Sequence, residues 1–178
     1  MNRIILTYGL ISGLVIISSI LGTLLVAGDA SHSSVWLGYL IMLVALSAIL
    51  VGVRQYRDQA LGGVITFRTA ALMGLGIAMV ASATYVVVWE IYLAATDYAF
   101  MPKYAAQALE AKRAAGVTGS EYAKFGTEMA AMVRQYTNPL IRLPMTFVEI
   151  FPVGLLVALV SAALLRNPRF LPATAKAA

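Results

Sequence analysis

Residues Asn138 to Leu165 read NPLIRLPMTFVEIFPVGLLVALVSAALL, and this stretch decides the fold class. Most of it is an apolar run, and a helix needs roughly 20 such residues to cross a bilayer. Near its centre lie a carboxylate, Glu149, and a proline, Pro152. A charge and a helix-interior proline both cost free energy in lipid, so each requires a physical reason.

Three further apolar blocks of similar length precede this stretch. Of the 178 residues, 61% are hydrophobic and 12% are charged, whereas about 25% of the residues of a soluble domain are charged. The chain is therefore predicted to be all-α, an integral membrane four-helix bundle forming one membrane domain over residues 1–178. The expected spans are residues 4–28, 35–53, 69–93 and 143–165. The first is too long for the apolar core of a signal peptide, about 7–15 residues, so a retained helix is expected.

The polar region before the last span predicts an extramembrane helical hairpin over residues 101–137, and a tail follows the last span at residues 166–178. Pro102 suits the first turn of one helix, and Thr118 with Glu121 forms a capping-box pattern for the next. One face of this second helix is apolar at helical spacing: Tyr122, Phe125, Met129, Met132, Val133 and Tyr136. That face packs on its partner helix or the membrane, or it docks another protein. The sequence leaves both interpretations open.

Small residues recur every four positions on three of the expected spans. This pattern lets helices approach closely. It indicates packing within the chain, and it also suits association with a second copy or with another membrane protein. The residues are Gly9 and Gly13, then Ala70, Gly74, Ala78 and Ser82, then Gly154, Ala158 and Ala162.

The basic residues predict the orientation in the membrane. Short cytoplasmic segments are enriched in Lys and Arg, and one side of the predicted topology collects Arg3, Arg54, Arg57, Arg68, Arg166, Arg169 and Lys176. Both termini are therefore expected in the cytoplasm, with the hairpin on the outer side of the membrane. This distribution explains the net charge of +5 without a nucleic-acid partner. Arg54, Arg57 and Arg68, expected in a loop, are also candidate contacts for anionic lipid headgroups.

Glu90 and Glu149 are the carboxylates within the expected spans. At about 1.5 Å rise per residue, both lie roughly 8–10 Å below the outer interface, so they could face each other. Pro152 frees the carbonyl of Val148 beside Glu149. Such a group forms either a buried structural cluster or an ion or proton site. The side chains that could satisfy the acids are Tyr85, Tyr92, Thr146 and Arg142.

Little in the chain indicates catalysis. The absence of cysteine excludes disulfides, thiolate metal sites and cysteine nucleophiles. The single histidine, His32, has Asp29 as its only neighbour of a metal-ligating type, so no metal site and no cofactor are expected. No nucleophile or oxyanion motif accompanies the two acids, and the chain is predicted not to be an enzyme.

Several segments together resemble a bacterial membrane family, domain of unknown function 4199. They are Tyr8–Gly13, Val53–Phe67, Tyr136–Leu140 and Thr146–Gly154, and they occur in the same order over nearly the whole chain. The resemblance implies a four-span inner-membrane protein, and it carries over no catalytic residues because the family has no established activity.

Two functional hypotheses follow. The first is a non-enzymatic membrane component that associates with itself or with another membrane protein through the small-residue faces and the hairpin. The second is a small oligomeric transporter or channel that uses Glu90 and Glu149 as an ion or proton site. The chain shows no inverted repeat, which disfavours the second hypothesis.

Overall fold

The computed structural model describes residues 1–27 and 35–173, and every regular element in these two ranges is an α-helix. The prediction of an all-α chain is confirmed. The expectations for Asp29 and His32, and for the end of the tail from residue 174, lie outside the described residues. The helices are α1 (Asn2–Ala27), α2 (Val35–Leu46), α3 (Ala48–Ala60), α4 (Phe67–Ala95), α5 (Phe100–Ala114), α6 (Gly119–Thr137) and α7 (Pro139–Leu165).

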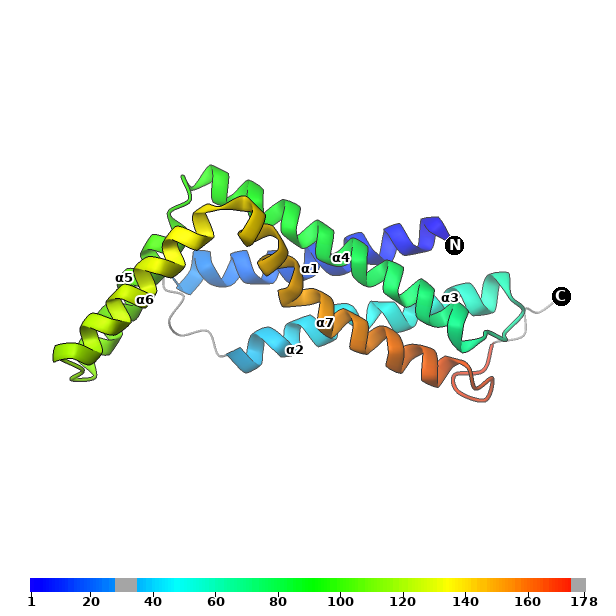
Figure 1. The fold of residues 1–178 in the computed structure, drawn as a ribbon. Helices are drawn as coiled ribbons and strands as arrows, with labels where there is room; N and C mark the ends of the chain where they lie inside the picture. Colours follow the sequence, from blue (N-terminus) through cyan, green and yellow to red (C-terminus); the bar gives the residue numbers. More distant parts are fainter. Residues whose placement is uncertain (28–34, 174–178) are drawn as a thin grey trace.

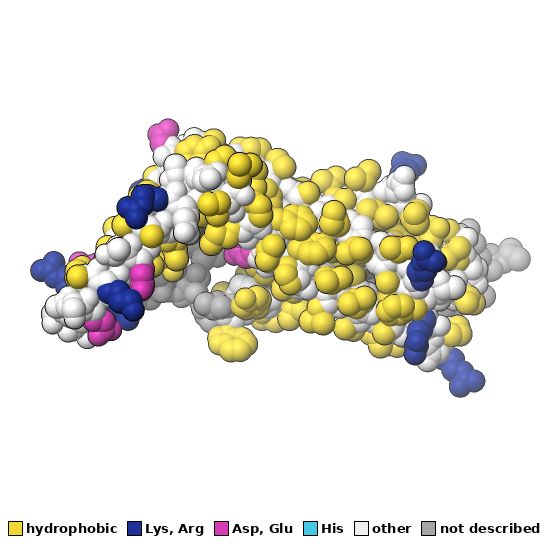
Figure 2. Space-filling view, in the orientation of Figure 1, with side chains coloured by type: hydrophobic (Ala, Val, Ile, Leu, Met, Phe, Trp, Pro, Cys, Tyr) yellow, Lys and Arg dark blue, Asp and Glu magenta, His cyan; other side chains and the backbone are white. Residues whose placement is uncertain are grey.

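Four helical segments are long and apolar enough to cross a membrane, which indicates a multi-pass membrane protein. These segments, called the spans below, are Asn2–Leu24, Trp36–Ala60, Phe67–Ala95 and Pro139–Leu165. Figure 1 shows the start of α1 and the end of α7 toward one end of the spans, and the α5–α6 hairpin at the other end. The middle of the molecule is covered by hydrophobic side chains. Lys and Arg lie at both ends, accompanied by Asp and Glu on the hairpin and without visible acids at the end opposite to it (Figure 2).

The second span is longer than predicted and is interrupted. Ser47 separates α2 from α3, and its hydroxyl donates to the carbonyl of Val44 over 2.6 Å. Helix α3 then continues to Ala60, so the prediction that the loop begins at Arg54 is wrong. An ion pair stabilises the extra turn: Nε of Arg54 lies 3.4 Å from Oδ2 of Asp58, one helical turn later. The chain turns at Gly62 and Gly63, as predicted, and both have positive φ.

The last span also begins earlier than predicted, at Pro139 rather than at residue 143. Asn138 ends α6 and caps α7, since its side chain accepts a hydrogen bond from the amide of Leu140 over 3.0 Å. Pro139 fits directly after this cap because its missing N–H needs no partner there. The chain therefore turns from the hairpin into the last span at a single residue, and Pro144 and Pro152 both lie inside α7.

Helix α4 is the element on which α1 and α7 pack, through the small-residue faces. A Cβ added to Gly74 would lie 2.8 Å from Cβ of Ala158, and one added to Gly154 would lie 2.8 Å from Cβ of Ala78. At each of these two contacts, a glycine of one helix packs against an alanine of the other. The contact between α1 and α4 is equally close, since a Cβ added to Gly13 would lie 2.6 Å from the carbonyl oxygen of Ala81. The predicted close packing within the chain is confirmed.

The hairpin has the predicted form, with α5 and α6 joined by a turn in which Gly116 and Gly119 have positive φ. Thr118 occupies the N-cap position of α6, but its side chain forms no capping hydrogen bond, so the predicted capping box is not made. Much of the apolar face of α6 is covered by α5. Lys112 of α5 lies 5.5 Å from the ring centre of Phe125, and Met129 is buried.

We expect the α4–α7 contact to tolerate no added methyl group. Gly74→Ala places its Cβ against Ala158, and such overpacking costs about 1–3 kcal/mol. Gly22→Ala is the matched control, because a Cβ there meets no described neighbour within 4 Å. Unfolding in detergent micelles should show Gly74→Ala destabilised and Gly22→Ala unchanged or slightly stabilised. Equal stability of the two variants would contradict the observed packing.

Candidate functional site

Arg142, in the first turns of α7, is the centre of a polar cluster at the hairpin end of the spans. Its side chain is 4% exposed. Nε donates to Oε1 of Glu90 and Nη2 donates to Oε2, each over 2.7 Å. Two parallel bonds of this kind give the strongest and most directional Arg–carboxylate geometry. The pair joins α7 to α4 and neutralises two charges that lipid would disfavour.

The remaining guanidinium nitrogen of Arg142 binds the end of α6. Nη1 donates to the carbonyl oxygen of Tyr136 over 2.9 Å and to that of Thr137 over 3.5 Å. The last carbonyls of a helix have no partner within it, so they need such an external donor. Arg142 therefore connects three helices, α4, α6 and α7, with one planar group.

Two tyrosine rings complete the surroundings of the guanidinium. The Arg142 Cζ lies 5.0 Å from the ring centre of Tyr98 and 5.8 Å from that of Tyr136, within the range of cation–π attraction. Asp97 and Tyr98 have φ of 51° and 55°, a left-handed conformation that costs a non-glycine residue free energy. The amide of Tyr98 donates to the carbonyl of Leu93 over 2.8 Å, which terminates α4 and directs the Tyr98 ring to Arg142.

An aromatic layer on α4 supports the cluster. Trp89 donates through Nε1 to the hydroxyl of Tyr136 over 2.7 Å, and its ring stacks on Tyr92 with centres 5.3 Å apart. Phe100 of α5 meets Trp89 edge-on at 4.9 Å. Burial raises the pKa of Tyr136 above its ordinary value, so its hydroxyl stays neutral at physiological pH. The hairpin is thus attached to the spans through both polar and aromatic contacts.

Glu149 lies in a different environment from Glu90. Its side chain is exposed on the flank of α7 and interacts with the hydroxyl of the buried Tyr85. Pro152, one turn later, is also exposed, and so is Val148, whose carbonyl it frees. The sequence left open whether the two acids meet, and in the structure they have separate partners, Arg142 for Glu90 and Tyr85 for Glu149. Tyr136 contacts Arg142 both through its carbonyl oxygen and through its ring.

The sequence identified the ionic partners and missed part of what holds them. Glu90, Arg142, Tyr85 and Glu149 come together in two pairs, and Tyr92 contributes by stacking. The ring and backbone partners of Arg142 were not predicted: Tyr98, the ring of Tyr136, and the carbonyls of Tyr136 and Thr137. Nor was the hydrogen bond from Trp89 to the hydroxyl of Tyr136. The matching depth of Arg142 and Glu90 on adjacent antiparallel spans was the signal available for the central pair.

The arginines at the opposite end of the spans separate into two kinds. Arg57 is 0% exposed: it pairs with Asp58 over 2.6 Å, donates to the carbonyl of Phe170 over 3.0 Å and also binds the carbonyl of Leu171. It therefore fixes the C-terminal segment and does not face lipid headgroups. Arg54 and Arg68 lie nearer the surface, and Arg68 is exposed. Within the described residues, no group of three His, Asp or Glu side chains is placed to hold a metal.

A family model described as protein of unknown function (DUF4199) matches residues 7–167. No curated protein and no solved structure matches the chain. Because the family match begins in α1 and ends just beyond α7, the chain belongs to the DUF4199 family.

Proposed function

We propose that this protein is a non-enzymatic component of a bacterial inner membrane that acts by association, and that the α5–α6 hairpin is the surface through which it associates. One observation carries the proposal: Arg142 binds Glu90 of α4 and the final carbonyls of α6 with the same guanidinium. A hairpin attached in this way presents a defined surface, as specific recognition requires.

The spans themselves offer less for association than their sequence suggests. The small-residue faces of α1, α4 and α7 are buried against one another, as the contacts of Gly13, Gly74 and Gly154 show. Those faces are therefore occupied within one copy of the chain. The hairpin instead has an exposed polar surface with charges of both signs, including Glu121, Lys124, Glu128 and Arg134.

The charge distribution supports an orientation with both termini in the cytoplasm and the hairpin in the periplasm. Arg3, Arg54, Arg68, Arg166 and Arg169 belong to segments at the end opposite the hairpin. In Figure 2 this end shows Lys and Arg without visible acids, whereas the hairpin shows charges of both signs. Short segments rich in Lys and Arg stay on the cytoplasmic side of the membrane.

Site-specific photocrosslinking tests the association. A benzophenone amino acid at Lys124 or Glu128 should give a discrete protein adduct in native membranes, with the mass of a dimer if the partner is a second copy. The matched control is the same group at Val44, which lies on a span and is 66% exposed, and which should crosslink to lipid. Only monomer from both hairpin positions would contradict the proposal.

The exposed carboxylate of Glu149 favours a second candidate function, a small oligomeric transporter or channel. Glu90 is neutralised by Arg142, so an ion or proton site at this end would rest on Glu149, with Tyr85 and the carbonyl freed by Pro152 beside it. A carboxylate within a span that has no cationic partner is expensive in lipid and often functional.

Proton or cation flux in proteoliposomes tests this candidate. If Glu149 carries the ion, Glu149→Gln should abolish the flux, while Glu128→Gln on the hairpin should leave it unchanged. A flux that survives Glu149→Gln at its full rate would remove Glu149 as the site.

A further inference from the structure

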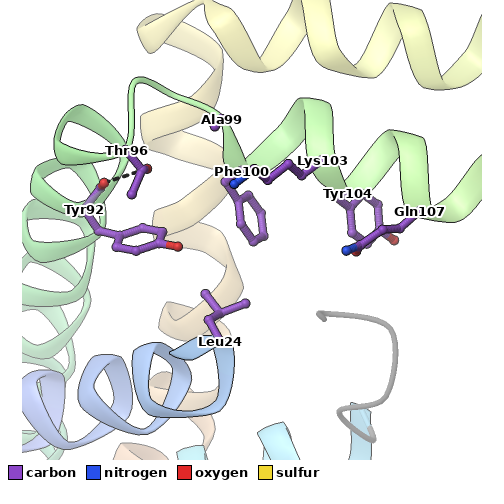
Figure 3. Close-up of a pocket in the computed structure, with 8 residues that line it drawn as sticks. All are labelled: Leu24, Tyr92, Thr96, Ala99, Phe100, Lys103, Tyr104 and Gln107. Atoms are coloured by element: carbon purple, nitrogen blue, oxygen red, sulfur yellow. Dashed lines mark hydrogen bonds between the residues drawn. The ribbon is translucent and has the colours of Figure 1, made fainter. Parts of the chain in front are cut away.

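A cavity of about 160 Å³ lies at the base of the hairpin, away from the Arg142 pair. It is formed where the end of α1, the end of α4 and the beginning of α5 meet (Figure 3). The residues that line it are Leu24, Tyr92, Thr96, Ala99, Phe100, Lys103, Tyr104 and Gln107.

The walls of the cavity combine apolar surface with one cation. Figure 3 shows the rings of Tyr92 and Phe100 directed into the space above Leu24, with the Tyr92 hydroxyl pointing from α4 toward α5. Lys103 runs back along α5 toward Thr96 in the same view. The Thr96 hydroxyl is occupied, since it donates to the carbonyl of Tyr92 over 2.9 Å. Among the described residues that line the cavity, Lys103 is the charged one, so the charge that a ligand meets there is positive.

The position of the cavity indicates where a ligand comes from. Leu24 and Tyr92 lie in the last turns of α1 and α4, so in a membrane that these helices cross the cavity falls at the level where lipid headgroups meet water. Its volume is well below the roughly 300–1,000 Å³ of pockets for drug-sized molecules. It suits one small charged group together with the first methylenes of a chain.

We propose that this cavity binds the anionic headgroup of a membrane lipid, with its phosphate or carboxylate at Lys103 and its first methylenes against Leu24 and Phe100. Apolar walls beside a lysine at the interface match an amphiphile better than a soluble anion. Helix α5 begins at Phe100, and the positive end of its dipole at this N-terminus attracts an anion, as Lys103 does. This inference is independent of the partner proposed for the hairpin.

Quenching of Trp89 by brominated lipid tests the proposal. The chain has two tryptophans, and Trp36→Phe leaves Trp89, whose ring lies 5.3 Å from that of Tyr92 and 4.9 Å from that of Phe100. The Trp36→Phe protein is titrated in micelles with phosphatidylglycerol or phosphatidylcholine, each brominated on the upper acyl chain. Phosphatidylglycerol should quench at about fivefold lower mole fraction, the ratio expected from roughly 1 kcal/mol per lysine.

Two lysine variants separate the cavity from general attraction to charge. Lys103→Gln should abolish the preference for phosphatidylglycerol. Lys112→Gln, which removes a charge on the same helix beside Phe125, should keep it. Equal quenching by both lipids, or an unchanged preference in Lys103→Gln, would overturn the proposal. Inorganic phosphate at millimolar concentration should not reverse the quenching, and reversal would assign the cavity to a soluble anion instead of a lipid.

Discussion

The fold of this chain depends on burying one guanidinium near the end of its spans. A buried charge without a partner is strongly unfavourable, and removing one member of a buried pair costs about 3–5 kcal/mol. Arg142 meets this constraint with both oxygens of Glu90 and with the free carbonyls at the end of α6. Because those acceptors belong to different helices, satisfying the charge also determines how α4, α6 and α7 converge. The rings of Tyr98 and Tyr136 then pack against the guanidinium, and Trp89 holds Tyr136 in place through its hydroxyl.

The two ends of the molecule use arginine in the same way. At the hairpin end Arg142 binds the last carbonyls of α6, and at the opposite end Arg57 binds the carbonyls of Phe170 and Leu171 after α7. Between them the spans are held by close contact of glycine and alanine on α4 and α7. In lipid, helix association rests on such packing and on polar contacts, because burying apolar surface gains little there. Because these small-residue faces are occupied within one copy of the chain, we propose partners for the hairpin and for the cavity at its base instead.

Local signals predicted most of the helices, and the errors came from contacts made over long distances in the chain. The glycine pair at 62–63 and Asn138-Pro139 terminate helices through backbone geometry, which short sequence patterns report directly. Arg54 and Arg57 were expected in a loop because charges usually end a span. Arg57 remains helical and buried because its acceptors lie more than a hundred residues later, at Phe170 and Leu171. Equal depth likewise left open whether Glu90 and Glu149 meet, because depth alone does not determine which direction a side chain faces around a helix.

The central claim, that the Arg142–Glu90 pair sets the position of the hairpin on the spans, can be tested most directly by a distance measurement. The chain has no cysteine, so cysteines introduced at Lys124 on the hairpin and Leu156 on α7 accept spin labels without background. Pulsed electron–electron double resonance in nanodiscs measures the distance between the two labels. The distribution of this distance should be narrow in the otherwise native protein and broad in Glu90→Gln. Glu128→Gln, which removes a charge on the hairpin surface, should leave the distribution narrow. An identical narrow distribution in Glu90→Gln would contradict the account.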